Sequence, residues 1–270
     1  MRSNHQAGGG WAVVTGASSG LGAIFAQQLA DRGMPLILAG RDASRLAEVQ
    51  ERVHQRAPGR QVELVVGDLG TSTGIQDLIA VLDGREIDVL VNNAGFGTYG
   101  PVAETDADRE HDLVAVNVDA LVQLTHAVLP GMLERGRGGI VNVASVIAFQ
   151  PAPYQATYGA SKAFVLSFSQ ALWAETRGTG VTVTALCPGP TRTGFVDALE
   201  ADVSDVAVYK HLAAPEPVVA AGLRALDRGQ PVVVPGWRNW LLANGADVSP
   251  SRISTFISSR MLRPAHAVAQ

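Results

Sequence analysis

The chain alternates between short apolar segments and amphipathic segments with helical spacing. Ile75, Leu78, Ile79 and Leu82 follow the i, i+3, i+4, i+7 pattern of one helical face. Short apolar runs separate such segments and predict buried strands. These runs are 11–15, 35–39, 61–66, 87–91, 139–145, 181–186 and 231–234. Because strands and helices alternate, we predict an α/β fold with a parallel sheet.

The same pattern predicts the domain organisation. One long helix is expected over 106–134, and another carries Tyr158. No internal repeat or low-complexity linker divides the chain, so 11–236 is predicted to form a single domain. Residues 1–10 are polar and glycine-rich; we expect a disordered tail there, without the apolar centre of a signal peptide. Residues 237–270 are expected to form a helical extension.

Composition narrows the functional classes. The chain has 270 residues, of which 47% are hydrophobic and 17% charged, and this is enough for a large core. Its formal net charge of −4 offers no basic surface to nucleic acid. Cys187 is the single cysteine, so no intrachain disulfide can form, and we expect a reducing, cytoplasmic location. The six histidines are scattered and do not support a metal site, and no apolar run reaches transmembrane length.

A glycine-rich segment follows the first predicted strand. It reads Gly16-Ala-Ser-Ser-Gly20-Leu-Gly22 and leads directly into a predicted helix. Strand, glycine turn and helix together present backbone N–H groups to a pyrophosphate. The spacing differs from the G-x-G-x-x-G fingerprint, and three glycines can also form a simple tight turn. The flanking strand and helix favour a dinucleotide site.

The end of the second predicted strand indicates a preference for NADP. An acidic residue there would bind the ribose 2′-hydroxyl of NAD, but this chain has Gly40 followed by Arg41. A guanidinium suits the 2′-phosphate of NADP, and the alternative is that Arg41 is a solvated loop residue. Asp42 is expected to cap the next helix. Asp68, after the third strand, either contacts adenine or caps a turn.

The candidate catalytic residues lie around the fifth predicted strand. Tyr158 and Lys162 are four residues apart, so a helix places them on one face. An ammonium beside a phenol is expected to lower the pKa of the tyrosine. Ser145 ends the strand, and its hydroxyl there can bind a carbonyl oxygen while Tyr158 transfers a proton. The alternative is a packed aromatic residue beside a lysine that reaches solvent.

Asn117 lies in an otherwise apolar stretch of the predicted helix 106–134. A buried amide needs hydrogen-bond partners, so this residue is either structural or part of a proton path. From the residues alone, the structural role is preferred.

Two later segments lie beyond the predicted sheet motifs, and the first of them is a candidate substrate lid. Residues 194–214 follow the loop 188–193 and have no clean periodicity, which is typical of a lid. Beyond 236, Ser249-Pro250 is expected to begin a second helix. The apolar faces of this extension are Trp237, Trp240 and Leu241, and then Ile253, Phe256, Ile257 and Met261. We expect them to pack on the core or on a partner subunit. Interleaved aromatic and basic residues make membrane-surface association the less favoured alternative.

Together these motifs resemble the short-chain dehydrogenase/reductase family over about residues 11–235. The resemblance implies a single-domain, doubly wound, seven-stranded parallel sheet of the Rossmann type, with strand order 3-2-1-4-5-6-7. Residues 92–100 and the tail after Gly236 resemble a bacterial subgroup whose substrates are mostly unassigned. The motifs that carry the resemblance are Thr15-Gly16-x-x-x-Gly20-x-Gly22, Asn92-Asn93-Ala94-Gly95, Ser145, Tyr158-x-x-x-Lys162 and Pro188-Gly189.

The resemblance also implies the role of each site residue. Tyr158 would be the acid/base and Ser145 would orient the substrate oxygen. Lys162 would lower the tyrosine pKa and hold the nicotinamide ribose, while Asn117 would anchor a water in the proton relay. Ser19 stands where some NADP-binding members carry a second basic residue. The cofactor-binding residues would be Gly16, Ser18, Ser19, Gly20, Leu21, Gly22, Arg41, Asp68, Leu69, Asn93, Ala94, Gly95, Tyr158, Lys162, Pro188, Gly189, Thr191 and Thr193.

The expected activity is the NADP(H)-dependent interconversion of a ketone or aldehyde and an alcohol, with NAD(H) as the less favoured cofactor. The alternatives are a reductase of carrier-bound 3-oxoacyl groups and a non-catalytic NADP-binding regulatory protein. The resemblance implies a homodimer or homotetramer. Apolar substrate walls are expected from Phe96, Tyr99, Phe149, Tyr154 and Phe195.

Overall fold

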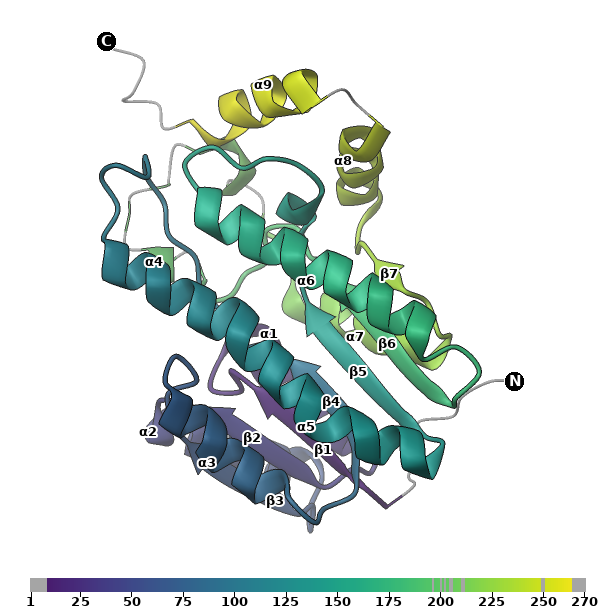
Figure 1. Ribbon diagram of the computed structural model, residues 1–270. Helices are drawn as coiled ribbons and strands as arrows, with labels where there is room; N and C mark the ends of the chain where they lie inside the picture. The colour runs from purple at the N-terminus through teal and green to yellow at the C-terminus, as the bar shows by residue number, and fades with distance from the viewer. Residues whose placement is uncertain are drawn as a thin grey trace.

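A computed structural model of the protein describes residues 9–195, 197–199, 201, 203, 206–209, 212–248 and 251–263. Within these residues, seven parallel strands form one sheet in the order β3-β2-β1-β4-β5-β6-β7 (Figure 1). The predicted fold class and strand order are therefore confirmed. The strands are β1 (Trp11–Thr15), β2 (Leu36–Gly40), β3 (Val62–Val66), β4 (Ile87–Asn92), β5 (Gly138–Val143), β6 (Val181–Leu186) and β7 (Val232–Val233).

Helices cover both faces of the sheet. One face packs against α1 (Gly20–Asp31), α2 (Ala43–Arg56) and α7 (Pro215–Asp227). The other face packs against α3 (Ser72–Leu82), α5 (Ala120–Arg135) and α6 (Ala156–Glu175). The remaining elements are α4 (Ala107–Val114), η1 (Ala115–Asp119), η2 (Val146–Phe149), η3 (Asp197–Leu199), η4 (Ala207–Tyr209), α8 (Trp237–Val248) and α9 (Ser251–Leu262).

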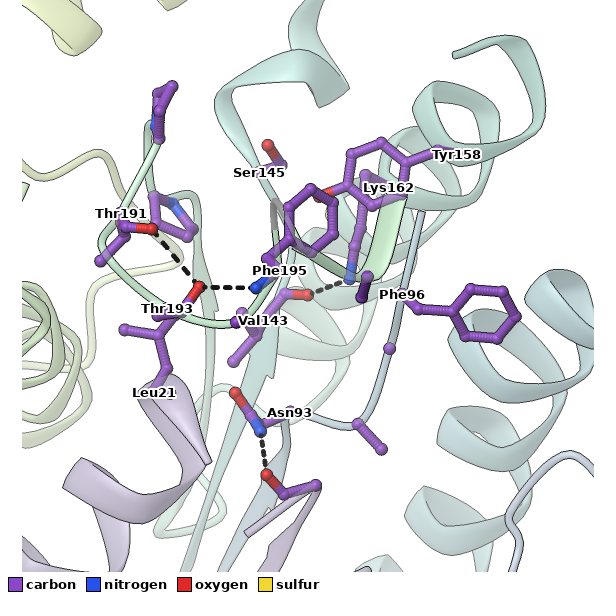
Figure 2. Close-up of a pocket in the computed structure, with 18 of the residues that line it drawn as sticks. Leu21, Asn93, Phe96, Val143, Ser145, Tyr158, Lys162, Thr191, Thr193 and Phe195 are labelled. Atoms are coloured by element: carbon purple, nitrogen blue, oxygen red, sulfur yellow. Dashed lines mark hydrogen bonds between the residues drawn. The ribbon is translucent and has the colours of Figure 1, made fainter. Parts of the chain in front are cut away.

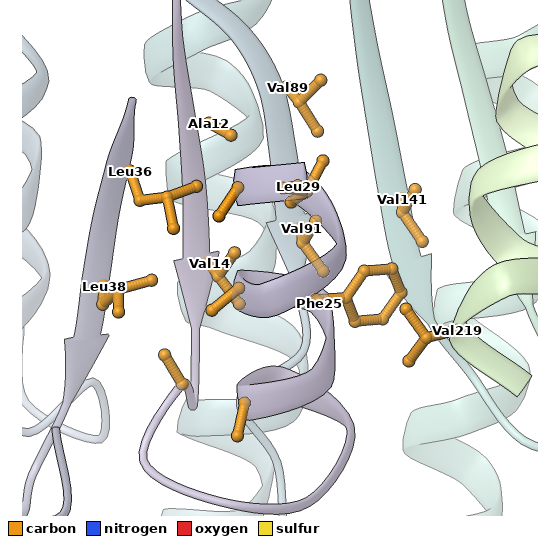
Figure 3. Close-up of a cluster of buried hydrophobic side chains, with 14 of the residues drawn as sticks. Ala12, Val14, Phe25, Leu29, Leu36, Leu38, Val89, Val91, Val141 and Val219 are labelled. Carbon is orange, nitrogen blue, oxygen red and sulfur yellow. The ribbon is translucent and has the colours of Figure 1, made fainter. Parts of the chain in front are cut away.

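Successive residues of each buried strand point to opposite faces of the sheet, so each strand contributes to the core on both faces. In β1, Val14 faces α1 and α7, whereas its neighbour Val13 faces α3 and α5. Both residues are fully buried, as expected for a parallel sheet that is covered on both sides. On the first face, Phe25 of α1 lies beside Val141 of β5 and Val219 of α7 (Figure 3).

The expected helix 106–134 differs from the structure in one important respect. It is interrupted by η1, a single π-helical turn over Ala115–Asp119, which joins α4 to α5. A π turn inserts an extra residue into the helical ladder and is frequent at functional sites. The continuous stretch Ala107–Arg135 is also long and apolar enough to cross a membrane by length and composition, contrary to our expectation. In the structure, α5 packs against β4 and β5 with the buried face of this stretch.

The first described residues are held by a hydrogen bond to β4, whereas the C-terminal helices pack against short helical turns of the domain. Residues 1–8 of the predicted disordered tail lie outside the described residues, and Gly10 donates its backbone N–H to the Asp88 carboxylate at 3.2 Å. At the other end, α8 packs against η2 and α9 against η4, above the carboxyl ends of the strands (Figure 1). The predicted start of the second helix at Ser249-Pro250 also lies outside the described residues.

The extension does not pack on the core through its expected apolar faces. Trp237, Trp240 and Leu241 are all more than half exposed, as are Ile253 and Phe256. Among the described side chains of the extension, those of Ala243, Ser254, Ser258 and Leu262 are buried instead, and the first three are short. Tight approach of helix backbones to the domain below requires such short side chains.

Candidate active site

The loops at the carboxyl edge of the sheet surround one large cavity of about 1210 Å³. It extends from Arg41, after β2, to Tyr158 on α6 and on to the C-terminal extension. Figure 2 shows Ser145, Tyr158 and Lys162 grouped together in this cavity. Open parallel sheets bind ligands at this edge, beside the point where strand order reverses, which here lies between β1 and β4.

Most of the predicted site residues meet in this one space. Of the predicted cofactor-binding residues, all but Gly22 line the cavity. Of the predicted catalytic residues, Ser145, Tyr158 and Lys162 line it and Asn117 does not. Residues separated by more than a hundred positions in the chain are thus brought together by the parallel topology.

The glycine turn is held against the loop after β4 by side-chain hydrogen bonds. The Thr15 hydroxyl accepts the backbone N–H groups of Asn93 and Ala94, at 3.0 and 2.9 Å. The Asn93 amide in turn donates to the carbonyl oxygen of Thr15 at 2.8 Å. At Gly22, a Cβ would lie 2.2 Å from the carbonyl oxygen of Gly16, so a larger residue would push the turn apart.

This turn fits a dinucleotide pyrophosphate. Helix α1 begins at Gly20, its N-cap Ser19 makes no side-chain capping hydrogen bond, and its first turn contains no acidic residue. The backbone N–H groups at the start of a helix attract an anion. Ser19 and Gly20, at the start of α1, both line the cavity. A dinucleotide here would be held by this turn, by Asn93 and by the loop that contains Thr193.

The end of the cavity beside β2 contains two arginines. Arg41 is exposed, and its guanidinium lies 3.8 Å from the Asp68 carboxylate. Asp42 caps α2 as predicted, since it accepts the backbone N–H of Arg45 at 3.0 Å. Asp68 accepts the N–H of Gly70 at 2.9 Å and also lines the cavity, so both of its expected roles remain compatible with the structure. Arg45 lines the cavity as well, and our reading of the sequence did not single it out.

The catalytic group combines a strand end with a helix. Tyr158 and Lys162 are almost fully buried on one face of α6, which excludes the alternative of a lysine reaching solvent. The Lys162 ammonium donates to the carbonyl oxygen of Val143 at 2.8 Å and lies 5.8 Å from the centre of the Tyr158 ring. Ser145, at the start of η2, hydrogen-bonds the Tyr158 side chain.

The expected lowering of the tyrosine pKa is wrong for this structure. Burial raises the pKa of Tyr158 well above its ordinary value, the neighbouring Tyr209 adds to the rise, and the hydrogen bond from Ser145 lowers it only in part. Burial also lowers the pKa of Lys162 to about 8, partly offset by Cys187. Loss of hydration penalises the phenolate and the ammonium alike, and the ammonium is directed to a backbone carbonyl. Tyr158 is consequently held in its protonated form.

Asn117 has partners that account for its burial. Its side-chain oxygen accepts the N–H of Phe96 at 3.1 Å, and its amide donates to the carbonyl of Phe96 and to Ser161, both at 3.0 Å. Asn117 lies on the π turn, and these hydrogen bonds join it to the loop after β4 and to α6. These contacts agree with the structural role, while the water-anchoring role stays a prediction.

The substrate end differs from the expected set of aromatic walls. Phe96 and Phe195 line the cavity, and the Phe195 ring lies 5.2 Å from that of Tyr158. Tyr99 and Tyr154 do not line it but stack on each other, and Phe149 packs in a separate core cluster. The walls that sequence reasoning missed are Ile147, Gln155, Val208, Tyr209, Leu242, Met261 and Leu262. The place of the last five depends on how η4, α8 and α9 fold back, and no local pattern in the sequence encodes it.

Cys187 is buried without a disulfide, beside the lysine. Burial raises the pKa of this thiol to about 12, with Lys162 opposing the rise. A protonated, inaccessible thiol agrees with its expected role as inert core packing.

Comparison with known proteins identifies the family. The model of the family described as short chain dehydrogenase matches residues 10–204. The chain belongs to the short chain dehydrogenase family. Its members are oxidoreductases that act on CH–OH groups, and the resemblance inferred from the sequence is confirmed.

Three similar proteins illustrate the range within the family. A very-long-chain 3-oxoacyl-CoA reductase of Anas platyrhynchos is 40% identical over 67% of this chain, a match that spans 59% of the reductase. A short-chain dehydrogenase from Sphingobium yanoikuyae, solved with NADPH, is 32% identical, has a TM-score of 0.80 and covers 97% of this chain, with 98% of its own length matched. A family member from Burkholderia phymatum, solved with NAD, is 30% identical, has a TM-score of 0.77 and covers 87% of this chain and 91% of its own. Relatives thus bind either nicotinamide cofactor.

Burial of Lys162 predicts a pH dependence of stability. The folded pKa of about 8 lies below the ordinary value of 10.5, so the unfolded chain binds an extra proton between these pH values. The cost of burying the charge is fully present below pH 8 and is relieved as the pH rises toward 10.5. The free energy of unfolding of the wild type, minus that of Lys162→Met, should therefore rise by about 3 kcal/mol from pH 7 to pH 10.5. Urea denaturation of both proteins across this range would measure it, and a constant difference would contradict it.

Proposed function

We propose that this protein is an NADP(H)-dependent carbonyl reductase or alcohol dehydrogenase that acts on an apolar substrate. The observation that carries the proposal is the single cavity that joins a glycine-rich helix start and Arg41 to Ser145, Tyr158 and Lys162. Because the cavity is continuous, a cofactor can lie along the glycine-rich turn while a substrate reaches the buried hydroxyl of Tyr158. A reducing, cytoplasmic location is part of the proposal, since the single cysteine of this chain can form no intrachain disulfide.

The residues divide the chemistry between them. When bound, the nicotinamide supplies or accepts a hydride at the carbinol carbon. The Tyr158 hydroxyl, held protonated, donates its proton to the carbonyl oxygen during reduction and takes it back during oxidation. Ser145, at hydrogen-bonding distance from that hydroxyl, fixes the substrate oxygen. The Lys162 ammonium provides positive charge that stabilises a phenolate whenever the proton has left Tyr158.

The substrate end of the cavity supports an apolar substrate. Its walls include Phe96, Phe195, Val208, Leu242 and Met261. These residues come from the loop after β4, the segment between β6 and α7, α8 and α9. Large cavities with predominantly apolar walls and few polar groups are typical sites for small hydrophobic ligands.

A homodimer or homotetramer is also part of the proposal. Leu133 of α5 and Phe164 of α6 are exposed apolar side chains. Helix α5 follows Asn117, and α6 carries Tyr158. Packing of these helices against a second copy would cover both side chains.

A reductase of 3-oxoacyl thioesters is the second candidate. The Tyr209 hydroxyl, which donates to Gln155 at 3.0 Å, gives the cavity a polar pair close to Tyr158 that could receive a second substrate oxygen. The similarity to the Anas platyrhynchos reductase supports this candidate. Comparison of kcat/KM for a 3-oxoacyl thioester and for a simple ketone of equal chain length distinguishes the two. A preference for the simple ketone rejects the thioester.

Removal of the phenol oxygen tests the mechanism. Tyr158→Phe should lower turnover of a ketone at least ~100-fold, because the proton donor is lost while the ring remains. NADPH affinity, measured by fluorescence titration, should be retained. Tyr154→Phe removes a hydroxyl outside the cavity and serves as the control, with turnover close to wild type. Near-normal turnover of Tyr158→Phe would reject the mechanism.

The basis of cofactor choice can be tested at Arg41, which lies between β2 and α2. Arg41→Ala should weaken NADPH binding at least ~10-fold and leave NADH binding nearly unchanged, because only NADPH carries the 2′-phosphate. Arg52→Ala is the matched control, since Arg52 is an exposed arginine of α2 that does not line the cavity. Fluorescence titrations with each cofactor give the affinities. Equal losses for both cofactors, or tighter wild-type binding of NADH, would contradict the assignment of Arg41.

A further inference from the structure

The C-terminal extension gathers the exposed apolar side chains of the protein. Among the described residues, seven large apolar side chains on α8 and α9 are roughly half exposed or more, whereas five others are scattered over the rest of the molecule. We name these seven the α8–α9 surface. They are Trp237, Trp240, Leu241, Leu242, Ile253, Phe256 and Ile257. A concentration of this kind on two adjacent helices marks an interaction site.

This surface is basic, although the whole protein is acidic. Residues 237–263 contain four arginines and one aspartate, while the chain as a whole has a net charge of −4. Two of the arginines lie over the exposed rings: Arg238 is 5.3 Å from the centre of Trp237, and Arg260 is 5.7 Å from that of Phe256. Positive charge is therefore interspersed with the apolar side chains.

The same two helices form part of the substrate cavity. Leu242, which is exposed on the α8–α9 surface, also lines the cavity, as do Met261 and Leu262 on α9. The Tyr99 hydroxyl donates to the carbonyl oxygen of Leu262 and fixes the end of α9 to the loop after β4. The surface thus borders the cavity.

We propose that the α8–α9 surface docks on a lipid bilayer that contains anionic headgroups, and that an apolar substrate enters the cavity from there. Aromatic and aliphatic side chains partition below the headgroups, while arginines contact the headgroup phosphates. The docking step stands on the surface alone, and the entry of substrate rests on the proposed function.

A second copy of this chain is a weaker match to the surface. A two-fold interface places one patch against itself, so the arginines of both copies would be brought together. An anionic bilayer offers apolar volume and the opposite charge at once. Charge complementarity therefore favours the bilayer.

Co-sedimentation of the full chain with vesicles tests the docking. We expect the protein to pellet with vesicles of phosphatidylcholine and phosphatidylglycerol, and at least ~10-fold less with phosphatidylcholine alone. Ile253→Ser/Phe256→Ser should lower the partition coefficient at least ~10-fold, because two exposed apolar side chains are removed from the bilayer contact. Arg252→Gln/Arg260→Gln should remove the preference for phosphatidylglycerol. Val66→Ser, which also replaces an exposed apolar residue but lies on β3, at the opposite edge of the sheet from β7, should pellet as the wild type does.

Several outcomes would overturn the proposal. These are no pelleting with either vesicle, equal pelleting of wild type and Ile253→Ser/Phe256→Ser, and no dependence on phosphatidylglycerol. Light scattering that shows a wild-type dimer converted to a monomer by Ile253→Ser/Phe256→Ser would assign the surface to a second copy. Circular dichroism and NADPH titration confirm that each variant is folded. Pelleting requires no turnover, so failure of the proposed activity and failure of docking are separate results.

Discussion

The arrangement of the site depends on the junction of β1 and β4 at the reversal of strand order. Thr15 at the end of β1 accepts two N–H groups from the loop after β4, and Asn93 from that loop donates back to the carbonyl of Thr15. Neighbouring strands whose connections leave toward opposite faces open a crevice between them. These hydrogen bonds keep the crevice at one width, so the start of α1 and the catalytic face of α6 border a common cavity.

The catalytic group shows the opposing effects of burial. Enclosure of Tyr158 keeps its proton in place, and enclosure of Lys162 makes its ammonium easier to deprotonate. A protonated phenol is the form that can donate to a carbonyl oxygen, and a nearby ammonium stabilises the phenolate that is left. Burial of the Lys162 ammonium lowers the free energy of unfolding, and its hydrogen bond to the backbone carbonyl of Val143 offsets part of this cost.

The C-terminal extension has two different faces. Its inner face closes the substrate end with Met261 and Leu262, and its outer face exposes Trp237 and Phe256. A domain without this extension would leave its substrate cavity open at that end. The extension therefore determines both the size of the cavity and the surface that surrounds its rim.

The sequence determined the elements and the chemical groups. Apolar runs and helical spacing are local, so the strands, the helices and the turn Gly16–Gly22 could be predicted, and the spacing of Tyr158 and Lys162 on α6 needed only the pitch of a helix. Tertiary structure alone decided the rest. The direction of the Tyr158 pKa shift depends on burial by several segments, and the hydrogen bonds of Asn117 depend on Phe96 in the loop after β4 and on Ser161 of α6. Tyr209 lines the cavity because η4 folds back over the carboxyl edge of the sheet. Trp237 is exposed because of the way α8 packs against the domain. Periodicity shows which side chains share a face, but what that face meets is set by packing between segments far apart in sequence.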